Sequence, residues 1–314
     1  QPYIPDMIKY LKENNYTRIS EGALVVDVKE ETDTREIPPC IIQKSDGASL
    51  YNTTDLATIV ERMKLFDPDK IIYITDKRQE LYFETVFRCA RKTKLVKEDT
   101  ELVHIGYGTM NGKDGKPFKT REGGVMRLEN LIKNVNDEVY NKIMENRTMD
   151  EEEARSIAAQ VGLAALKYGD LSNQISKDYI FDIDRFTSFE GDTGPYILYT
   201  IVRIKSILAK YAEIYKEAPE AGEIRPAASE QEEALMLELC KFNEMLKNAY
   251  QELAPHRICA FIYDIANAFN SFYHETKIIT EEDELKRSSY IALISLVLRV
   301  LLTCIDILGF SAPE

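Results

Sequence analysis

A short stretch of glycines and basic residues, from Gly112 to Gly124, has the composition best suited to chemistry in this chain. It holds four basic residues and four glycines within thirteen positions, directly after the apolar segment 102–107. Glycines let backbone N–H groups approach a ligand closely, and lysines supply mobile positive charge. The stretch therefore favours a polyphosphate site at the end of a strand.

Two further observations bear on this loop. Pro117 follows Lys116, so the stretch is not the phosphate-binding loop of the ordinary nucleotide hydrolases, which needs Ser or Thr after Gly-Lys at the opening of a helix. A solvated hairpin tip explains the same residues, with Asp114 and Gly115 in a type I′ turn. The pattern alone leaves the phosphate site and the hairpin tip open.

Length and composition indicate the class of protein. The chain has 314 residues, which exceeds a comfortable single core, so two domains are expected. Its content of 44% hydrophobic and 30% charged residues is ordinary for a globular protein. The net charge of −13 argues against indiscriminate binding to nucleic acid, and no DNA partner is expected. It still allows a shaped RNA that is held by local basic patches.

Cysteine spacing and apolar runs indicate the compartment. Five cysteines lie far apart with no C-x-x-C pair, which fits a reducing cytosol and argues against a zinc site or a disulfide framework. No signal peptide opens the sequence. Arg299 and Asp306 interrupt the apolar segment 291–310, which therefore predicts a core helix and not a membrane span. We expect a cytoplasmic protein with no membrane partner and no bound metal.

The two halves of the chain have different patterns. The first half alternates strand-like and helix-like segments, and the spacing is typical of a β-α-β crossover in a parallel sheet. The predicted strands are 23–28, 40–44, 70–75 and 102–107, and the predicted helices are 54–66, opened by a Thr54 cap, and 79–94.

After the glycine-rich loop the chain is predicted to be helical. The expected helices are 128–147, a helix that runs through 167 from a capping box at Thr148 to Glu151, and then 196–217, 231–253, 256–275 and 282–308. Pro195 and Pro255 stand at helix openings, where a missing N–H costs nothing. The second half is therefore expected to be a helix bundle that begins near residue 193.

Five segments in register carry a resemblance to a known family. Together they resemble arginyl-tRNA synthetases, which are class I aminoacyl-tRNA synthetases, in family order and over essentially the whole chain. The segments are 46–55, 74–79, the loop 112–124, 179–196 and 308–314. Such enzymes join arginine to its tRNA by way of an arginyl-adenylate, with ATP and Mg²⁺ as the substrate complex and no tightly bound cofactor.

The resemblance implies a two-part architecture. Residues 1–192 would be the α/β second half of a class I nucleotide-binding, Rossmann-like catalytic domain. Residues 193–314 would be an all-α helix-bundle domain that binds the tRNA anticodon. This division agrees with the change from alternating to helical segments that the pattern predicts on its own.

The resemblance assigns three residues to the guanidinium group of the substrate arginine. Asp55 can accept paired N–H bonds from a planar guanidinium, and Tyr51 and Gln79 supply oriented polar atoms. Taken without the resemblance, the same residues read as structural. Asp55 is then a first-turn carboxylate, Tyr51 a partly buried aromatic residue and Gln79 a helix cap.

The resemblance assigns the nucleotide to two further segments. His104, Gly106 and Gly108 would seat the adenine and ribose, although a lone His at a strand end is also typical of a half-buried polar residue. Lys116 and Lys119 occupy the place of the class signature Lys-Met-Ser-Lys-Ser and would be catalytic, because they neutralise charge on the phosphates. No protein nucleophile is required, since the substrate carboxylate attacks.

Anticodon contacts are expected on the segment 268–273. Tyr273 is the candidate to stack on an unstacked base, whereas Phe269 and Phe272 are expected in the core. Arg203 and Lys205 could contact phosphates, with a solvated helix face as the alternative.

The sequence departs from the family in one respect. None of its three histidines lies in the class signature His-Ile-Gly-His. We therefore expect this chain to be a C-terminal fragment, inactive alone, of an arginine-tRNA ligase. The alternative is a non-catalytic tRNA-binding protein derived from a class I synthetase. The intact set of Tyr51, Asp55 and Gln79 favours the enzyme, as do both loop lysines, Lys116 and Lys119. The same three pocket residues, with the absence of metal-ligand spacing, argue against a synthetase for another amino acid.

Overall fold

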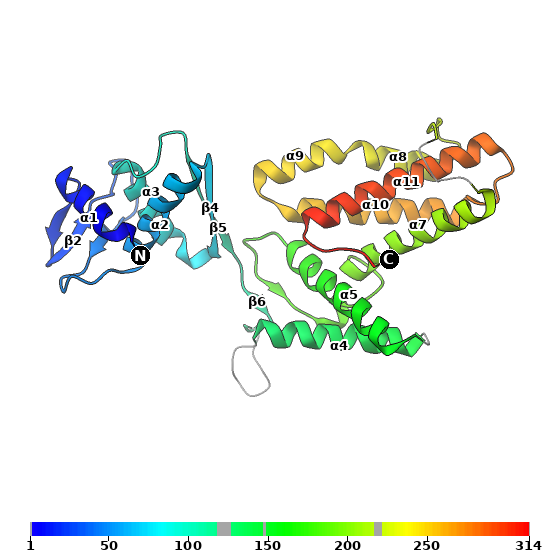
Figure 1. Ribbon diagram of the computed structural model, residues 1–314, viewed down its shortest axis with the longest axis horizontal. Helices are drawn as coiled ribbons and strands as arrows, with labels where there is room; N and C mark the ends of the chain where they lie inside the picture. The colour runs from blue at the N-terminus through cyan, green and yellow to red at the C-terminus, as the bar shows by residue number, and fades with distance from the viewer. Residues whose placement is uncertain (1, 118–126, 147–148, 217–221, 314) are drawn as a thin grey trace. The chain divides into compact units, whose positions relative to one another are not determined.

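The computed structural model describes residues 2–117, 127–146, 149–216 and 222–313 (Figure 1). The chain forms two compact units, Gln1–Gly108 and Thr109–Glu314. The boundary between the two units does not coincide with the change of pattern at residue 193. The helices between the glycine-rich loop and residue 193 belong to the second unit, because they pack against its later helices.

The first unit combines a small antiparallel sheet with a β-α-β crossover. Strands β1, β2 and β3 are adjacent in that order and antiparallel, and β4 pairs with β5 in parallel. The elements are α1 (Tyr3–Glu13), β1 (Arg18–Ser20), β2 (Ala23–Val26), β3 (Cys40–Gln43), α2 (Tyr51–Phe66), β4 (Lys70–Asp76), the 3₁₀ helix η1 (Lys77–Gln79), α3 (Glu80–Lys92) and β5 (Glu101–Tyr107).

The parallel pair β4–β5 confirms the predicted crossover. Its register runs from Lys70 opposite Glu101 to Asp76 opposite Tyr107, so both strands end at the same edge. Tyr73 of β4 is buried in one core with Leu56 of α2 and with residues of α3. The carboxyl ends of the strands therefore lie where η1 and α3 begin, which is the edge at which open α/β sheets bind ligands.

Helix α2 begins earlier than the sequence predicts. Leu50 is its N-cap and Tyr51 its first residue, so the prediction of a cap at Thr54 was wrong. The Thr53 hydroxyl accepts a hydrogen bond from the Leu50 N–H (3.1 Å) and donates one to the Ile42 carbonyl (2.6 Å). Thr53 thus supplies the capping bond and joins the helix start to β3.

The second unit contains a short parallel strand pair and a helix bundle. Its elements are β6 (Met110–Asn111), α4 (Leu128–Asn146), α5 (Glu151–Leu171), β7 (Tyr179–Ile180), α6 (Ile183–Phe186), α7 (Gly194–Tyr215), α8 (Glu230–Cys240), α9 (Phe242–Glu252), α10 (Pro255–Glu275) and α11 (Glu284–Ile307). The segment 231–253, predicted as one helix, forms two helices, which are separated at Lys241. Asp150 caps α5 by accepting bonds from two N–H groups.

The core of the second unit explains its most apolar helix. Among the described residues, α11 alone is long and apolar enough to cross a membrane. Its side chains Leu293, Ile294, Val297 and Leu301 are nevertheless fully buried in the core that it shares with α7 and α10. This burial confirms the prediction of a core helix.

The crossing of α5 and α7 leaves no space for a side chain at Gly194. A Cβ there would lie 2.4 Å from the Ala164 carbonyl oxygen, and backbone atoms cannot move aside cheaply. We predict that Gly194→Ala lowers the free energy of unfolding by roughly 1–3 kcal/mol in urea denaturation followed by circular dichroism. Glu213→Ala, at an exposed position of the same helix, is the control. Equal stability of the two variants would contradict this packing.

Candidate active site and RNA-binding groove

The three residues predicted to bind arginine lie at the beginnings of two helices of the first unit. Tyr51 opens α2 with 83% of its surface exposed, and Asp55 follows one turn later on the same face. Gln79 is exposed and ends η1, directly before α3. Because α2 and α3 are neighbours, the structure brings Asp55 beside the first turn of α3.

A hydrogen bond joins Asp55 to Tyr82, a residue that the sequence pattern does not indicate. The Tyr82 hydroxyl, from the first turn of α3, donates to Asp55 Oδ2. Burial, followed by the bond to Asp55, raises the pKa of Tyr82 well above its usual range. The hydroxyl therefore stays protonated and remains the donor. The only sequence signal is its position three residues after Gln79 on the same helix start.

His104 is half-buried on β5 and has structural contacts. Its Nε2 lies 2.8 Å from Thr75 Oγ1, and its ring stacks on Phe83 with centroids 4.8 Å apart. Burial lowers the pKa of His104 below its ordinary value, so the ring is neutral at pH 7. These contacts agree with the half-buried polar interpretation, and they do not test the predicted contact with ATP.

Gly106 has a packing reason to be glycine. A Cβ at this position would lie 2.6 Å from the Lys77 Cα, in the segment that leaves β4. The close approach of the two backbones keeps η1 against the end of β5. Gly108 is the last residue of the first unit.

The start of the glycine-rich loop is a hairpin turn, although not of the predicted type. The Gly115 N–H donates to the Gly112 carbonyl (2.9 Å), and the Gly112 N–H donates to the Lys116 carbonyl (2.8 Å). The backbone φ angle is +72° at Gly115, whereas it is not positive at Lys113 or at Asp114. The prediction of a type I′ turn was therefore wrong. The loop has a type I turn with a left-handed glycine after it.

The lysines of this loop have different environments. Lys113 Nζ lies 2.9 Å from the carboxylates of both Asp182 and Asp184, which raise its pKa. Lys113 therefore ties the loop to the segment after β7. Lys116 is exposed. Lys119, the other predicted catalytic lysine, lies outside the described residues.

The predicted anticodon residue Tyr273 lines a groove of about 640 Å³ in the second unit. The Arg203 guanidinium lies over two rings, 4.6 Å from the centroid of Tyr199 and 5.2 Å from that of Tyr273. Lys210, His274 and Lys277 also line the groove, and none of its described lining residues is acidic. Cations with exposed aromatic rings are what single-stranded nucleic acid requires.

One expectation about neighbouring residues is confirmed, and the predicted phosphate contacts of Arg203 and Lys205 stay predictions. Phe269 and Phe272 are fully buried, which confirms that they belong to the core. Lys205 Nζ donates to the Pro313 carbonyl (2.9 Å), so it binds the C-terminal segment of its own chain.

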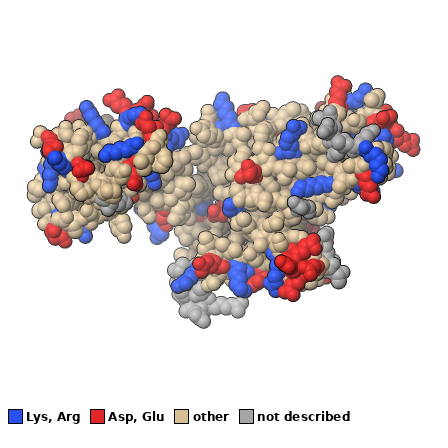
Figure 2. All heavy atoms as spheres, viewed as in Figure 1, with Lys and Arg blue, Asp and Glu red and all other residues tan. Residues whose placement is uncertain are grey.

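On the face shown in Figure 2, basic and acidic side chains are interspersed among the residues drawn in colour. This distribution fits local basic patches, not a broad basic surface.

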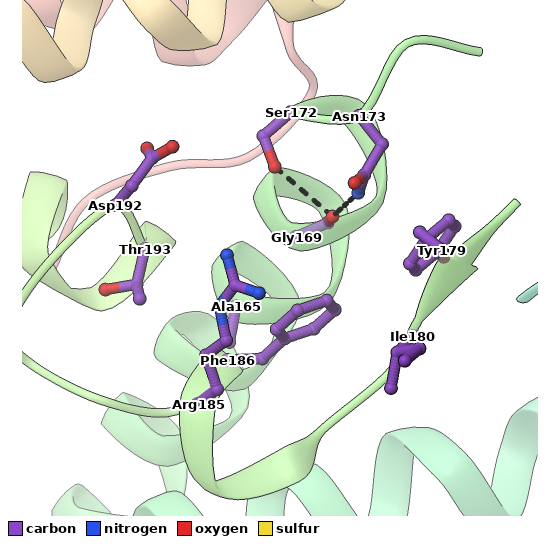
Figure 3. Close-up of a pocket in the computed structure, with 10 residues that line it drawn as sticks. All are labelled: Ala165, Gly169, Ser172, Asn173, Tyr179, Ile180, Arg185, Phe186, Asp192 and Thr193. Atoms are coloured by element: carbon purple, nitrogen blue, oxygen red, sulfur yellow. Dashed lines mark hydrogen bonds between the residues drawn. The ribbon is translucent and has the colours of Figure 1, made fainter. Parts of the chain in front are cut away.

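A polar cavity of about 240 Å³ lies elsewhere in the second unit (Figure 3). Arg185 extends into the space that Gly169 of α5 and Thr193 border. Ser172 and Asn173 donate to the Gly169 carbonyl and close one wall. None of the predicted site residues lines this cavity. In the part of the chain that the structure describes, no group of three or more His, Cys, Asp or Glu residues could hold a metal ion.

Comparison with known proteins confirms the predicted fold class. The family described as tRNA synthetases class I (R), catalytic domain, matches residues 1–183, and the DALR anticodon binding domain matches residues 197–314. The arginine–tRNA ligases of Agathobacter rectalis and Alkaliphilus oremlandii are 63% and 60% identical to the whole chain, which covers 54% and 53% of them. The chain thus spans about half the length of the curated relatives it matches.

Solved structures show the same fold. The arginyl-tRNA synthetase of Plasmodium falciparum superimposes with a TM-score of 0.82 at 25% identity, over all of this chain and 52% of that one. The Thermus thermophilus enzyme gives a TM-score of 0.82 at 23% identity, over all of this chain and 58% of its own.

The environment of His104 predicts its titration. Because burial favours the neutral ring, we expect the imidazole to titrate below 6.5 in an NMR pH titration, with His104→Gln identifying its resonance. The unfolded chain then takes up this proton at a higher pH than the folded chain. The contribution of His104 to stability is therefore present above the unfolded pKa and is lost as the pH falls through the folded pKa. A midpoint at or above 6.5 would contradict the described contacts.

Proposed function

The chain belongs to the arginyl-tRNA synthetase family, and we propose that the protein containing it is an arginine-tRNA ligase. It would activate L-arginine with ATP to arginyl-adenylate and transfer the arginyl group to its tRNA. The observation that carries this proposal is the carboxylate of Asp55. Tyr82 holds its Oδ2, while its Oδ1 has no partner among the described residues and is available to a guanidinium N–H.

Tyr51 and Gln79 would complete the arginine pocket. Tyr51 lies one turn before Asp55 on α2, and Gln79 lies at the start of α3, so both can project toward a group bound at Asp55. The beginnings of two helices are electropositive, which disfavours a cation. The Asp55 charge would offset this effect and attract a cation, and the oriented polar atoms of Tyr51 and Gln79 would favour a planar guanidinium.

ATP, with Mg²⁺ as part of the substrate complex, would lie at the carboxyl end of β5. His104, Gly106 and Gly108 would face its adenine and ribose. Lys116 and Lys119 would neutralise its phosphates while the arginine carboxylate attacks the α-phosphorus and pyrophosphate leaves. Every atom of the bond that forms comes from the substrates, so no protein nucleophile is needed.

The tRNA would meet the second unit at the Tyr273 groove. We propose that residues 1–192 serve catalysis and that 193–314 bind the anticodon, which is close to the division between the two family matches. The 314 residues contain no His-Ile-Gly-His sequence, so we propose that this chain does not arginylate tRNA alone. Its work would be done in the cytoplasm, where tRNA is charged.

Asp55→Asn tests the enzyme assignment. In the complete gene product, measured by ATP–pyrophosphate exchange with tRNA present, we expect the KM for arginine to rise at least about 30-fold. Breaking one side of a buried charge pair costs about 2 kcal/mol or more. The KM for ATP should change little.

Glu61→Gln, which replaces another carboxylate of α2, is the matched control and should leave both constants unchanged. Equal rises in the KM for arginine and for ATP with Asp55→Asn would mean that Asp55 is structural. If the unaltered protein shows no exchange but binds tRNA, it is a non-catalytic tRNA-binding protein.

Tyr273→Ala tests the RNA-binding groove. We expect the variant to bind an arginine-tRNA anticodon stem-loop about 5- to 150-fold more weakly, because stacking contributes about 1–3 kcal/mol per base. Tyr250→Ala, at a tyrosine that is 70% exposed on α9 and outside the groove, should bind normally. Fluorescence anisotropy at fixed salt measures both. Equal affinities of the two variants would remove Tyr273 from the anticodon site.

A further inference from the structure

We propose that Tyr82 is a positioning residue for arginine, because it fixes the Asp55 carboxylate that receives the guanidinium group. This inference rests on the proposed function. It adds a residue to the arginine site that contacts no substrate itself and acts only through Asp55.

The hydrogen bond links the starts of α2 and α3. Tyr82 and Asp55 are 27 residues apart in sequence, and the Tyr82 hydroxyl donates to Asp55 Oδ2. An Asp side chain on a helix surface samples several rotamers, whereas one with a fixed oxygen keeps its carboxylate plane. Since Tyr82 occupies Oδ2, Oδ1 is the oxygen left to receive the ligand. A planar guanidinium requires this fixed geometry more than a flexible point charge does.

The Tyr82 ring is itself held by the core of the first unit. It packs edge-on against Phe83, with ring centroids 5.0 Å apart and an interplanar angle of 88°. Phe83 is buried, packs against Tyr73 at 4.9 Å and stacks on His104. Edge-to-face packing of this kind fixes ring orientation. The hydroxyl is therefore in place before any substrate arrives, and the carboxylate is preorganised.

A tyrosine suits this role because it is neutral. Burial and the bond to Asp55 raise the pKa of Tyr82, so the hydroxyl remains a donor throughout the physiological pH range. A lysine or arginine in its place would hold Asp55 but cancel the negative charge that the substrate needs. The phenol fixes the carboxylate and leaves its charge to the ligand.

The test is Tyr82→Phe, which keeps the packed ring and removes only the hydroxyl. In the complete gene product with tRNA present, we expect the KM for arginine to rise about tenfold, as for loss of one hydrogen bond to a charged group. The KM for ATP should not change, although Phe83 also contacts His104. Tyr10→Phe, which removes a hydroxyl that donates to the Thr93 carbonyl (3.1 Å) in the same unit, is the matched control and should alter neither constant.

A double-mutant cycle separates positioning from a general structural role. If Tyr82 acts through Asp55, Tyr82→Phe should have no further effect on arginine activation in the Asp55→Asn background. The same tenfold loss in both backgrounds would overturn the inference, and so would an unchanged KM for arginine in Tyr82→Phe alone. In either case a large effect of Asp55→Asn would leave the proposed function standing. Failure of the unaltered protein to activate arginine would overturn both.

Discussion

The parallel pairing of β4 with β5 is the constraint on which the candidate active site depends. A parallel pair needs a crossover, and here the crossover is η1 followed by α3, which leaves the sheet edge where both strands end. Gly106 allows the Lys77 backbone to pass close to β5. The first turn of α3 is thereby brought beside α2, where the Tyr82 hydroxyl donates to Asp55. The proposed arginine pocket is a consequence of this crossover.

One aromatic core supports both of the proposed substrate sites. Phe83 packs edge-on against Tyr82, the donor to Asp55, and stacks on His104. Tyr82 and His104 therefore contact the same buried ring, although they lie on different elements. Dense packing transmits small displacements, so changes in this core should affect the geometry of both sites.

The sequence predicts what depends on local pattern and fails where contacts are distant. The β-α-β unit and the long helices α7, α10 and α11 follow from periodicity. The start of α2 does not, because Thr53 obtains its partner from β3. The interruption of the helix at Lys241 and the type of turn at Gly115 also differ from what the sequence pattern predicts. Family resemblance indicates Asp55, but Tyr82 is found only when the fold brings two positions 27 residues apart into contact. The roles assigned to Lys116 and Lys119 stay predictions.

We propose that Asp55, fixed by Tyr82, is the partner of a guanidinium. A crystal structure of the complete gene product with bound L-arginine tests this most directly. We predict guanidinium nitrogens within hydrogen-bond distance of Asp55 Oδ1, with the Tyr82 hydroxyl still on Oδ2 and Tyr51 and Gln79 beside the ligand. A guanidinium that does not contact Asp55 would contradict this proposal. So would an Asp55 side chain that loses its hydrogen bond to Tyr82 when arginine binds.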